Sequence, residues 1–437
     1  MPISSAAPAA GKPASGVSNN AAMAMVTTLF FMWGFITCLN DILIPHLKAI
    51  FDLNYAEVML VQFAFFSGYF IFAMPAGKLI DWVGYKRTMV IGLCTMALGA
   101  LLFLPAASLP SFPFFLTALI IVAAGMTLLQ VSANPYVSVL GPPATASSRL
   151  NLTQAFNSLG TTIAPFFGSL LILSSAPKAL EETRRMAPDV LLNYRLQEAS
   201  TVKMPYLAIA AALLLLAVII GLFRLPHIKS VERDSGIHAD TSVWKVRHLI
   251  LGAAGIFVYV GAEVSIGSFL VNYFSQPYIG AMSEKEAAVY VSFYWGAAMV
   301  GRFIGSAILQ KLRTGRVLGF AAIAAGLLVT TSMLGFGSLA LWSIILVGLF
   351  NSIMFPSIFT LGIAGLGPLT GKGSGLLIAA IVGGAIIPVM QGALADRIGI
   401  QHAFILPVLC YIFIAYYGFR GSTPTTTIAP AANATVG

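Results

Sequence analysis

The sequence is poor in charge. Only 9% of its 437 residues are Asp, Glu, Lys or Arg, whereas 58% are hydrophobic. A soluble domain carries about 25% charged residues, and no globular core could hide this much apolar surface from water. The chain is therefore expected to lie in lipid as a polytopic membrane protein. This composition excludes soluble enzymes, secreted domains and nucleic-acid binders, even though the formal net charge is +9.

Cysteines and catalytic motifs are also scarce. The three cysteines, Cys38, Cys94 and Cys410, lie in apolar runs and indicate neither a disulfide framework nor a metal cluster. The glycine-rich stretch at 371–373 lacks the first glycine and the Ser/Thr of a P-loop, and neither H-E-x-x-H nor G-x-S-x-G occurs. We therefore expect a protein that is not an enzyme and that needs no cofactor.

Long polar stretches occur at only two internal places, 175–202 and 225–246. Elsewhere, apolar runs of about 20 residues recur, which is the length of a helix that crosses a bilayer. Twelve such spans are predicted at 23–51, 56–81, 87–108, 113–140, 150–174, 203–224, 247–275, 286–310, 316–336, 338–366, 374–395 and 401–420. The resulting fold is all-α, with two six-helix bundles at 23–224 and 247–420 and loose tails at 1–22 and 421–437.

Basic residues gather on one side of the predicted spans. If both tails are cytoplasmic, most of the 24 lysines and arginines fall in cytoplasmic segments. Four of the others, Lys178, Arg184, Arg185 and Arg195, fall in the outer excursion 175–202, where acidic residues offset them. This is the positive-inside pattern, and it predicts that both termini are cytoplasmic. The basic charge therefore reflects topology and requires no anionic partner.

Three pairs of short motifs recur at offsets near half of the chain length. Each pair keeps its internal spacing: Gln130 and Pro135 with Asn351 and Pro356, Gly160 and Pro165 with Gly383 and Pro388, and Gly68 and Gly77 with Gly296 and Gly305. Three matches in register indicate two similar halves in parallel orientation. In transporters built this way, the substrate binds near the midplane between the halves.

The segment between the second and third spans carries a compact motif. It reads Gly77-Lys-Leu-Ile-Asp81-Trp-Val-Gly84-Tyr-Lys86-Arg87, and it resembles the G-x-L-x-D-x-x-G-x-[KR]-[KR] signature of the major facilitator superfamily. Its glycines permit a tight turn and a close approach of helices. Asp81 can pair with a cation or a helix end, so we expect these five residues to latch one conformation. The alternative is an ordinary charged turn.

Further motifs narrow the resemblance. They are Trp33-Gly34 with Leu39-Asn40-Asp41, Gln130 to Tyr136, Arg149 to Gly160, and Tyr259 to Tyr273. Together they resemble the fucose:proton symporter family, and within it the glucose/galactose branch, over essentially all twelve spans. The resemblance implies a monosaccharide importer of a bacterial inner membrane, driven by a cation gradient. One departure concerns Gln130, because the fucose branch has a carboxylate there that is thought to handle protons.

Two carboxylates lie well inside predicted spans, namely Asp41 and Glu263. A charge in the hydrocarbon is opposed by roughly 2.5–3.5 kcal/mol on insertion scales, so such groups need partners or water. An intramembrane acid can carry a proton or coordinate a cation, and both residues are candidates for ion coupling. The alternative roles are a structural hydrogen bond for Asp41 and a fixed ion pair for Glu263. The coupling ion stays open between H⁺ and Na⁺, with a Na⁺ site near Asp41 as one option.

Amide side chains in the spans are the candidate sugar ligands, because an amide both donates and accepts hydrogen bonds as a hydroxyl does. Trp295 is added because an aromatic ring can stack on the apolar face of a pyranose. The predicted amides are Asn40, Gln130, Asn134, Gln154, Asn157, Asn272 and Asn351. The alternative is that these amides only join helices to one another.

Three rival functions stay open. Gly160-x-x-x-Ala-Pro165-x-x-Gly168 partly resembles the motif of drug or metabolite antiporters, although the amide-rich face suits a polyol better. The others are a sugar sensor that does not translocate and a channel. For a transporter we expect three partners, a small sugar, a coupling cation and the lipid bilayer, and a monomeric state. The amides do not distinguish glucose, galactose, mannose, fucose and N-acetylated hexoses.

Overall fold

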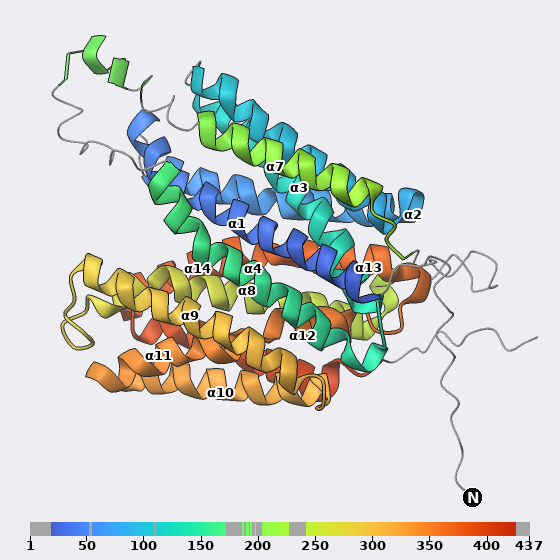
Figure 1. Ribbon diagram of the computed structural model, residues 1–437. Helices are drawn as coiled ribbons and strands as arrows, with labels where there is room; N and C mark the ends of the chain where they lie inside the picture. The colour runs from blue at the N-terminus through green and yellow to red at the C-terminus, as the bar shows by residue number, and fades with distance from the viewer. Residues whose placement is uncertain are drawn as a thin grey trace, which may run out of the picture.

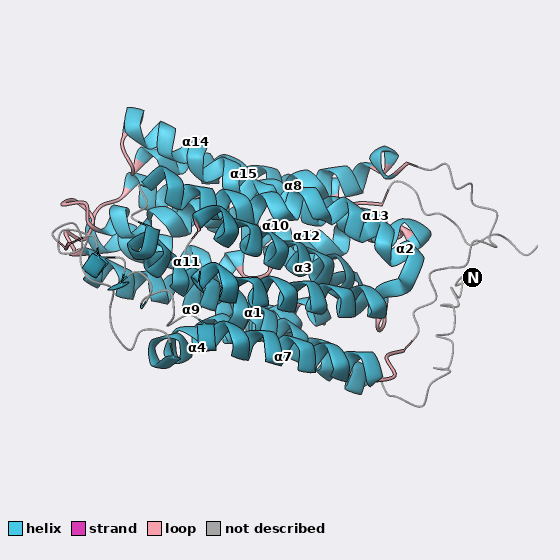
Figure 2. Cartoon of the chain, turned by 90° about the horizontal axis from the view of Figure 1, so that it is seen from above, coloured by secondary structure: helices cyan, strands magenta, loops and turns pink. Residues whose placement is uncertain are grey.

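The apolar runs form long helices, and Figure 2 shows no other regular element among the described residues. In this computed structural model the described residues are 19–51, 55–108, 111–171, 186–187, 189–191, 193–194, 197, 203–226 and 242–424. The predicted tails and the predicted polar stretches 175–202 and 225–246 lie mostly outside them.

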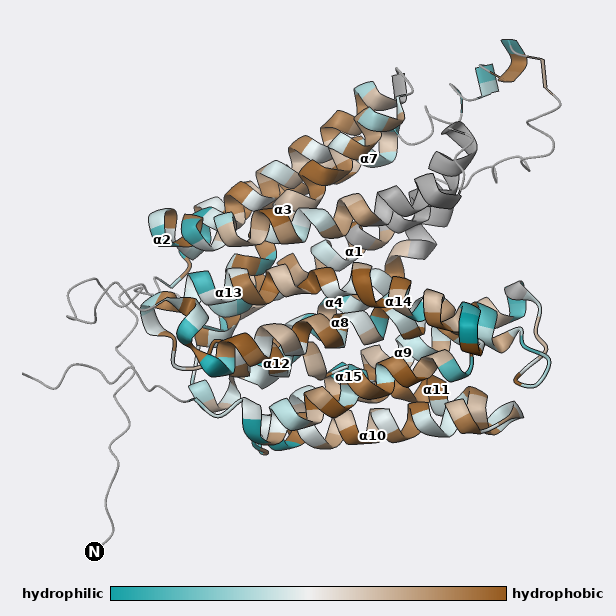
Figure 3. Ribbon diagram, turned by 180° about the vertical axis from the view of Figure 1, so that it is seen from behind, coloured by the Kyte–Doolittle hydropathy of each residue, from teal (hydrophilic) through white to brown (hydrophobic). Residues whose placement is uncertain are grey.

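The first half contains five long helices (Figure 1): α1 (Asn19–Phe51), α2 (Tyr55–Ser108), α3 (Phe112–Val139), α4 (Ala146–Leu171) and α7 (Lys203–Leu222). The second half begins with α8 (Arg247–Phe274), α9 (Glu284–Ile308) and α10 (Thr314–Leu334). It continues with α11 (Gly337–Asn351), α12 (Met354–Gly362), α13 (Thr370–Ala379), α14 (Gly383–Ile398) and α15 (Ile405–Tyr416). Figure 3 shows hydrophobic residues along these helices and hydrophilic ones concentrated near their ends.

The twelve predicted crossings are present. Ten stretches of the described residues are long and apolar enough to span a membrane, and the two further crossings are accounted for as follows. One of the ten, Phe63–Ala106, has 44 residues. It crosses twice, because α2 is broken at Gly84 by a positive φ of 80°. The twelfth crossing is α4, which is not among the ten, yet it packs between α1 and α9. Asn, Gln, Ser and Thr side chains lower the hydropathy of its first part, 146–164, and the more apolar residues 165–171 complete the helix.

Two spans differ from their predicted form. The second and third spans are separate helices as predicted: they share the label α2, but they meet at Gly84, whose backbone (φ 80°, ψ 168°) is not helical and reverses the chain. The tenth, predicted as 338–366, divides into α11 and α12. Pro356 explains this break, because it has no N–H to bond the carbonyl of Ser352. The eleventh divides into α13 and α14 at a 3₁₀ turn, Ala380–Val382.

The sequence repeat has a structural counterpart in helix packing. A side chain built on Gly160 of α4 would overlap the backbone carbonyl of Phe31 in α1. A side chain built on Gly383 at the start of α14 would likewise overlap the carbonyl of Phe257 in α8. Both glycines therefore let one helix lie directly against another at equivalent places in the two halves.

The two halves meet mainly along two pairs of helices, α2 with α13 and α4 with α9, with smaller contacts of α3 with α13 and of α4 with α12. These contacts lie where α4 begins, α9 ends and α13 begins, and we call this end of the bundle the closed end. In Figure 1 the helices α3 and α7 diverge from α9, α10 and α11 away from the closed end. The structure is therefore a pair of bundles joined at one end.

The glycine contacts predict opposite effects of one chemical change at two positions. Gly160→Ala should destabilise the protein by about 1–3 kcal/mol, because the added methyl group overpacks the contact with α1. Gly296→Ala is the matched control, because no heavy atom lies within 4 Å of its built side chain. Alanine has the better helix propensity by about 1 kcal/mol, so the control should be neutral or stabilising. Thermal unfolding in detergent measures both, and equal effects would contradict the packing argument.

Candidate functional site

Glu263 lies at the centre of a polar cluster in the second half. The hydroxyl of Tyr259, one turn earlier on α8, donates to Oε1 of Glu263 at 2.8 Å. The same hydroxyl lies 3.0 Å from the backbone carbonyl oxygen of Asn351 on α11. The carboxylate is therefore held by its own helix and tied to a neighbouring one.

Asn351 joins three tyrosines inside the cluster. Its Nδ2 donates to the hydroxyl of Tyr294 at 2.9 Å, and its Oδ1 accepts from the hydroxyl of Tyr411 at 2.7 Å. Its carbonyl oxygen lies 3.0 Å from the hydroxyl of Tyr259, as described above. All four side chains are buried. Asn351 was predicted to bind substrate, but in this conformation its amide connects α9, α11 and α15.

Arg302 connects the same cluster to the first half. Its guanidinium on α9 attracts the carboxylate of Glu263 electrostatically. Its Nη1 donates to the hydroxyl of Ser158 on α4, and its backbone carbonyl accepts from Nδ2 of Asn151 at 2.6 Å. A single residue of α9 therefore contacts α4 through both its side chain and its backbone.

The predicted amide face of α4 lies toward the centre of the bundle. Gln154 is only 7% exposed, and its side-chain amide has no hydrogen-bond partner among the described residues. Asn157 uses its Nδ2 to donate to the backbone carbonyl of Phe30 in α1 at 2.9 Å. One amide is thus free to take a ligand, and the other also helps to hold α4 against α1.

The two predicted amides of α3 differ in the same way. Gln130 is buried, and its Nε2 donates to the hydroxyl of Tyr69 in α2 at 2.7 Å. Asn134 is fully buried, and neither its Nδ2 nor its Oδ1 has a partner among the described residues. An amide buried without hydrogen bonds is costly, so Asn134 is a second place where a ligand hydroxyl would restore lost bonds.

The remaining predicted residues are spread along the bundle. Trp295 on α9 is 44% exposed, and its ring lies over Gly267 of α8, where an added side chain would meet it at 2.9 Å. Asn272 is exposed near the end of α8. Asn40 and Asp41 belong to α1, but their side chains lie outside the described residues, as does any Na⁺ site near Asp41.

The predicted latch spans the two halves at the closed end. A side chain built on Gly77 of α2 would meet the carbonyl oxygen of Gly371 at 2.7 Å. One built on Gly371 would meet Oδ1 of Asp81 at 3.2 Å. Gly371 is the second residue of α13, so the carboxylate of Asp81 lies beside the positive N-terminal end of a helix of the other half.

The other residues of the predicted latch, Gly84, Lys86 and Arg87, lie in the first half and have no described contact with the second. Gly84 forms the kink, and Nζ of Lys86 donates to the backbone carbonyl of Gly221 at the end of α7 at 2.7 Å. That bond satisfies a terminal carbonyl and places a positive charge at a helix C-terminus, where it is favoured. Arg87 is exposed. The motif therefore combines one contact between halves with one that fixes the kink.

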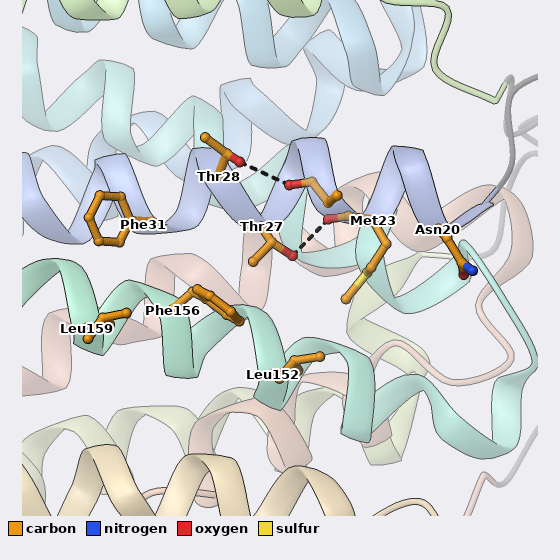
Figure 4. A pocket seen from close by; sticks show the side chains of 9 residues that line it. Asn20, Met23, Thr27, Thr28, Phe31, Leu152, Phe156 and Leu159 are labelled. Atoms are coloured by element: carbon orange, nitrogen blue, oxygen red, sulfur yellow. Dashed lines mark hydrogen bonds between the residues drawn. The ribbon is translucent and has the colours of Figure 1, made fainter.

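A groove on the opposite side of α4 is a separate feature (Figure 4). Its volume is about 630 Å³, and it lies between α1 and α4. Leu152, Phe156 and Leu159 line it on α4, on the face away from Gln154. The hydroxyls of Thr27 and Thr28 in its α1 wall are bonded to carbonyls of their own helix. None of the predicted sugar ligands lines this groove, so it does not form part of the amide site.

Sequence reasoning missed the tyrosines and a second copy of the latch motif. The spacing of four between Tyr259 and Glu263 could have indicated their contact, but Tyr294 and Tyr411 come from distant helices. The second copy is Gly392-Ala-Leu-Ala-Asp396-Arg-Ile-Gly399. Gly399 has φ 85° and ψ 153°, close to the φ 80° and ψ 168° of Gly84. This copy ends α14 and lies at the opposite end of the bundle from Asp81.

The geometry at Asp81 predicts that Asp81→Asn loosens the closed end. A charge at a helix terminus is worth about 0.3–2 kcal/mol, so the open fraction should rise roughly two- to thirty-fold. Ser374→Cys reports the change in a background without the native cysteines, because Ser374 is buried and donates to the carbonyl of Val131 across the halves. Its rate of thiol labelling should rise. Asp396→Asn is the matched control, and an equal rise there would contradict the latch.

The family model of the Major Facilitator Superfamily matches residues 23–381. A "Glucose/galactose transporter" of Brucella abortus is 53% identical over 401 residues, which cover 92% of this chain and 94% of the relative. An "L-fucose-proton symporter" of Escherichia coli is 36% identical over 410 residues, covering 92% and 93%. A crystal structure of the transporter FucP in the outward conformation has a TM-score of 0.85 at 35% identity and covers 92% of this chain and 99% of that one. The helices, the kink at Gly84 and these matches lead to one conclusion: the chain belongs to the major facilitator superfamily.

Proposed function

We propose that the protein is a secondary active transporter that imports a monosaccharide together with protons by alternating access. The observation that carries this proposal is a set of buried amides without partners among the described residues, in a bundle that also holds the intramembrane carboxylate Glu263 and whose halves join at one end. Relatives named as a glucose/galactose transporter and a fucose-proton symporter support the substrate class and the ion. Two bundles around one polar centre suit a rocking mechanism.

The sugar is assigned first to the amides that have no hydrogen-bond partner among the described residues. Gln154 and Asn134, from α4 and α3, each offer a donor and an acceptor to neighbouring hydroxyls. Asn157 is placed beside Gln154 and retains its Oδ1 for a ligand. Trp295 supplies an exposed ring from the second half. The sugar would thus contact both halves, as coupling between binding and rocking requires.

The other predicted sugar ligands are proposed either to bond further hydroxyls or to shape the walls of the site. Asn40 and Asn272, on α1 and α8, are proposed as further hydroxyl partners. Gln130 and Asn351 already bond tyrosines, so their proposed part is to shape the walls of the site. Specificity among hexoses then depends on how many of these amides reach each hydroxyl.

Protons are assigned to the two intramembrane carboxylates, Glu263 and Asp41. The carboxylate of Glu263 accepts a hydrogen bond from Tyr259 and lies near a cation, Arg302. Protonation or deprotonation of Glu263 therefore changes the net charge of the whole polar cluster. Gln130 cannot titrate, so in this chain the titratable pair consists of one acid in each half.

The closed end is assigned to the cytoplasm. Several basic residues lie at this end, namely Lys78, Lys86, Arg87, Arg149, Lys311 and Arg313. Lysine and arginine are enriched in cytoplasmic loops, so both termini are proposed to be cytoplasmic. In this orientation the structure is closed to the cytoplasm, which agrees with its likeness to a transporter in the outward conformation.

The sugar assignment predicts that Gln154→Ala weakens hexose binding by on the order of 1–3 kcal/mol, or about five- to 150-fold in Kd, because a sugar hydroxyl loses its partner. Titration calorimetry of the purified protein with glucose, galactose and fucose measures this. Gln310→Ala is the matched control, because Gln310 is exposed at the end of α9. Unchanged binding in Gln154→Ala, with the fold intact, would place the sugar elsewhere.

The ion assignment predicts that a pH gradient without Na⁺ drives accumulation of labelled sugar in proteoliposomes. A potential of 100 mV supplies about 2.3 kcal/mol per charge, or roughly fifty-fold accumulation. Asp41→Asn and Glu263→Gln should each abolish accumulation while retaining more of the counterflow exchange. Accumulation driven by Na⁺ alone at constant pH would overturn the proton assignment, and uptake that neither gradient drives would identify a facilitator.

A further inference from the structure

The helices α4 and α9 are joined by a ladder of contacts between the halves. Ser148 donates to the backbone carbonyl of Ser306 at 2.7 Å, and Ser306 donates back to the carbonyl of Ser148 at 3.1 Å. Farther from the closed end, the hydroxyl of Thr162 lies 3.5 Å from the sulfur of Met299. The 14 residues from Ser148 to Thr162 extend about 21 Å along α4. This ladder must separate if the closed end is to open.

Arg302 is placed between the ends of this ladder. Its guanidinium donates to Ser158, and its carbonyl accepts from Asn151, both on α4. Its Nε is buried and has no partner among the described residues. A cation in this position depends on a nearby counter-charge, because a buried and unpaired charge is strongly disfavoured.

The counter-charge comes from Glu263. Among the described residues, Tyr259 of α8 donates to its carboxylate, and Arg302 and Tyr294 of α9 and Tyr411 of α15 lie close enough to interact with it electrostatically. Tyrosine hydroxyls are neutral at physiological pH, so Arg302 is the cation of this set. Among the described residues, neutralising Glu263 therefore removes the carboxylate that balances the positive charge of Arg302 at the contact between halves.

We propose that Arg302 is the positioning residue that converts the charge state of Glu263 into separation of α4 from α9. With Glu263 ionised, Arg302 is balanced and holds Ser158. When Glu263 takes up a proton from the outer side, the guanidinium leaves Ser158 for water, and the ladder opens toward the cytoplasm. Release of that proton inside restores the carboxylate and the ladder. This inference rests on the proposed proton symport and names the contact through which it acts.

The test measures the distance across the ladder in the full-length protein in lipid nanodiscs. Ala144→Cys and Gln310→Cys place spin labels on exposed positions just before α4 and just after α9, with the native cysteines replaced by serine. Acidification should lengthen the distance in the otherwise unchanged protein. Each pKa unit by which the two conformations differ changes the open-to-closed ratio by up to about ten-fold.

Four variants separate signalling from simple packing. Glu263→Gln should give the long distance at every pH, and Arg302→Met should remove the pH response. Arg302→Lys retains the charge and should restore part of the response. Ser158→Ala weakens the link from the other helix, and should shift the transition toward higher pH even if Arg302→Met does not fold. Arg316→Met, an exposed control on α10, should behave as the parent protein.

These measurements distinguish failure of the proposed role of Arg302 from failure of the proposed transport function. If Arg302→Met lowers thermal stability but retains the full pH response, Arg302 is only a packing residue and the inference is wrong. If the parent protein accumulates sugar under a pH gradient but its distance does not depend on pH, the inference also fails while the transport function stands. If the protein carries no sugar yet the distances respond as expected, the transport function fails and the role of Arg302 stands.

Discussion

Every polar side chain in this bundle is subject to one constraint: in lipid, a hydrogen-bonding group must find its partner within the protein. Asn351 meets this constraint with three tyrosines, which come from α8, α9 and α15. Arg302 meets it by reaching the other half of the molecule. The positions of the second-half helices follow from such bonds, because apolar side chains alone pack against lipid as well as against each other. Among the described residues, buried groups that do not meet the constraint, above all the amide of Asn134, are therefore useful indicators of where a ligand binds.

The closed end shows how two different kinds of contact hold the same pair of bundles. Between α2 and α13 the contact is one of backbones, because Gly77 and Gly371 bring the helices together and a carboxylate lies beside a helix N-terminus. Between α4 and α9 it consists of side-chain hydrogen bonds and includes a cation. Only the second kind contains a group that communicates with the carboxylate of Glu263. The two sides of the closed end thus have separate tasks, one holding the bundles and the other responding to charge.

The sequence predicts the architecture well and the site less completely. Apolar run length predicts the crossings, and the Gly-Asp-Gly motif predicts a turn at Gly84, because these signals are local. The break between α11 and α12 was readable from Pro356 but was not assigned, since a hydropathy run continues through it. The tyrosine partners of Asn351 could not be predicted from the sequence, because which side chains of distant helices meet depends on how each helix is rotated about its own axis. The same limit applies to Asn157, whose bond to the carbonyl of Phe30 depends on how closely α1 approaches.

The polarity of α4 also has a consequence for how the protein is made. A helix enters the bilayer from the translocon according to its own hydropathy, and the first part of α4, residues 146–164, is rich in Asn, Gln, Ser and Thr. Its residues Asn151, Gln154 and Asn157 enter lipid more readily when other helices shield them. The helix it packs against in its own half, α1, is synthesised earlier and offers the carbonyl of Phe30. Its partner Arg302 is synthesised much later. Retaining α1 next to the translocon until α4 emerges would therefore favour insertion of α4, and the ladder with α9 can form only after the second half is inserted.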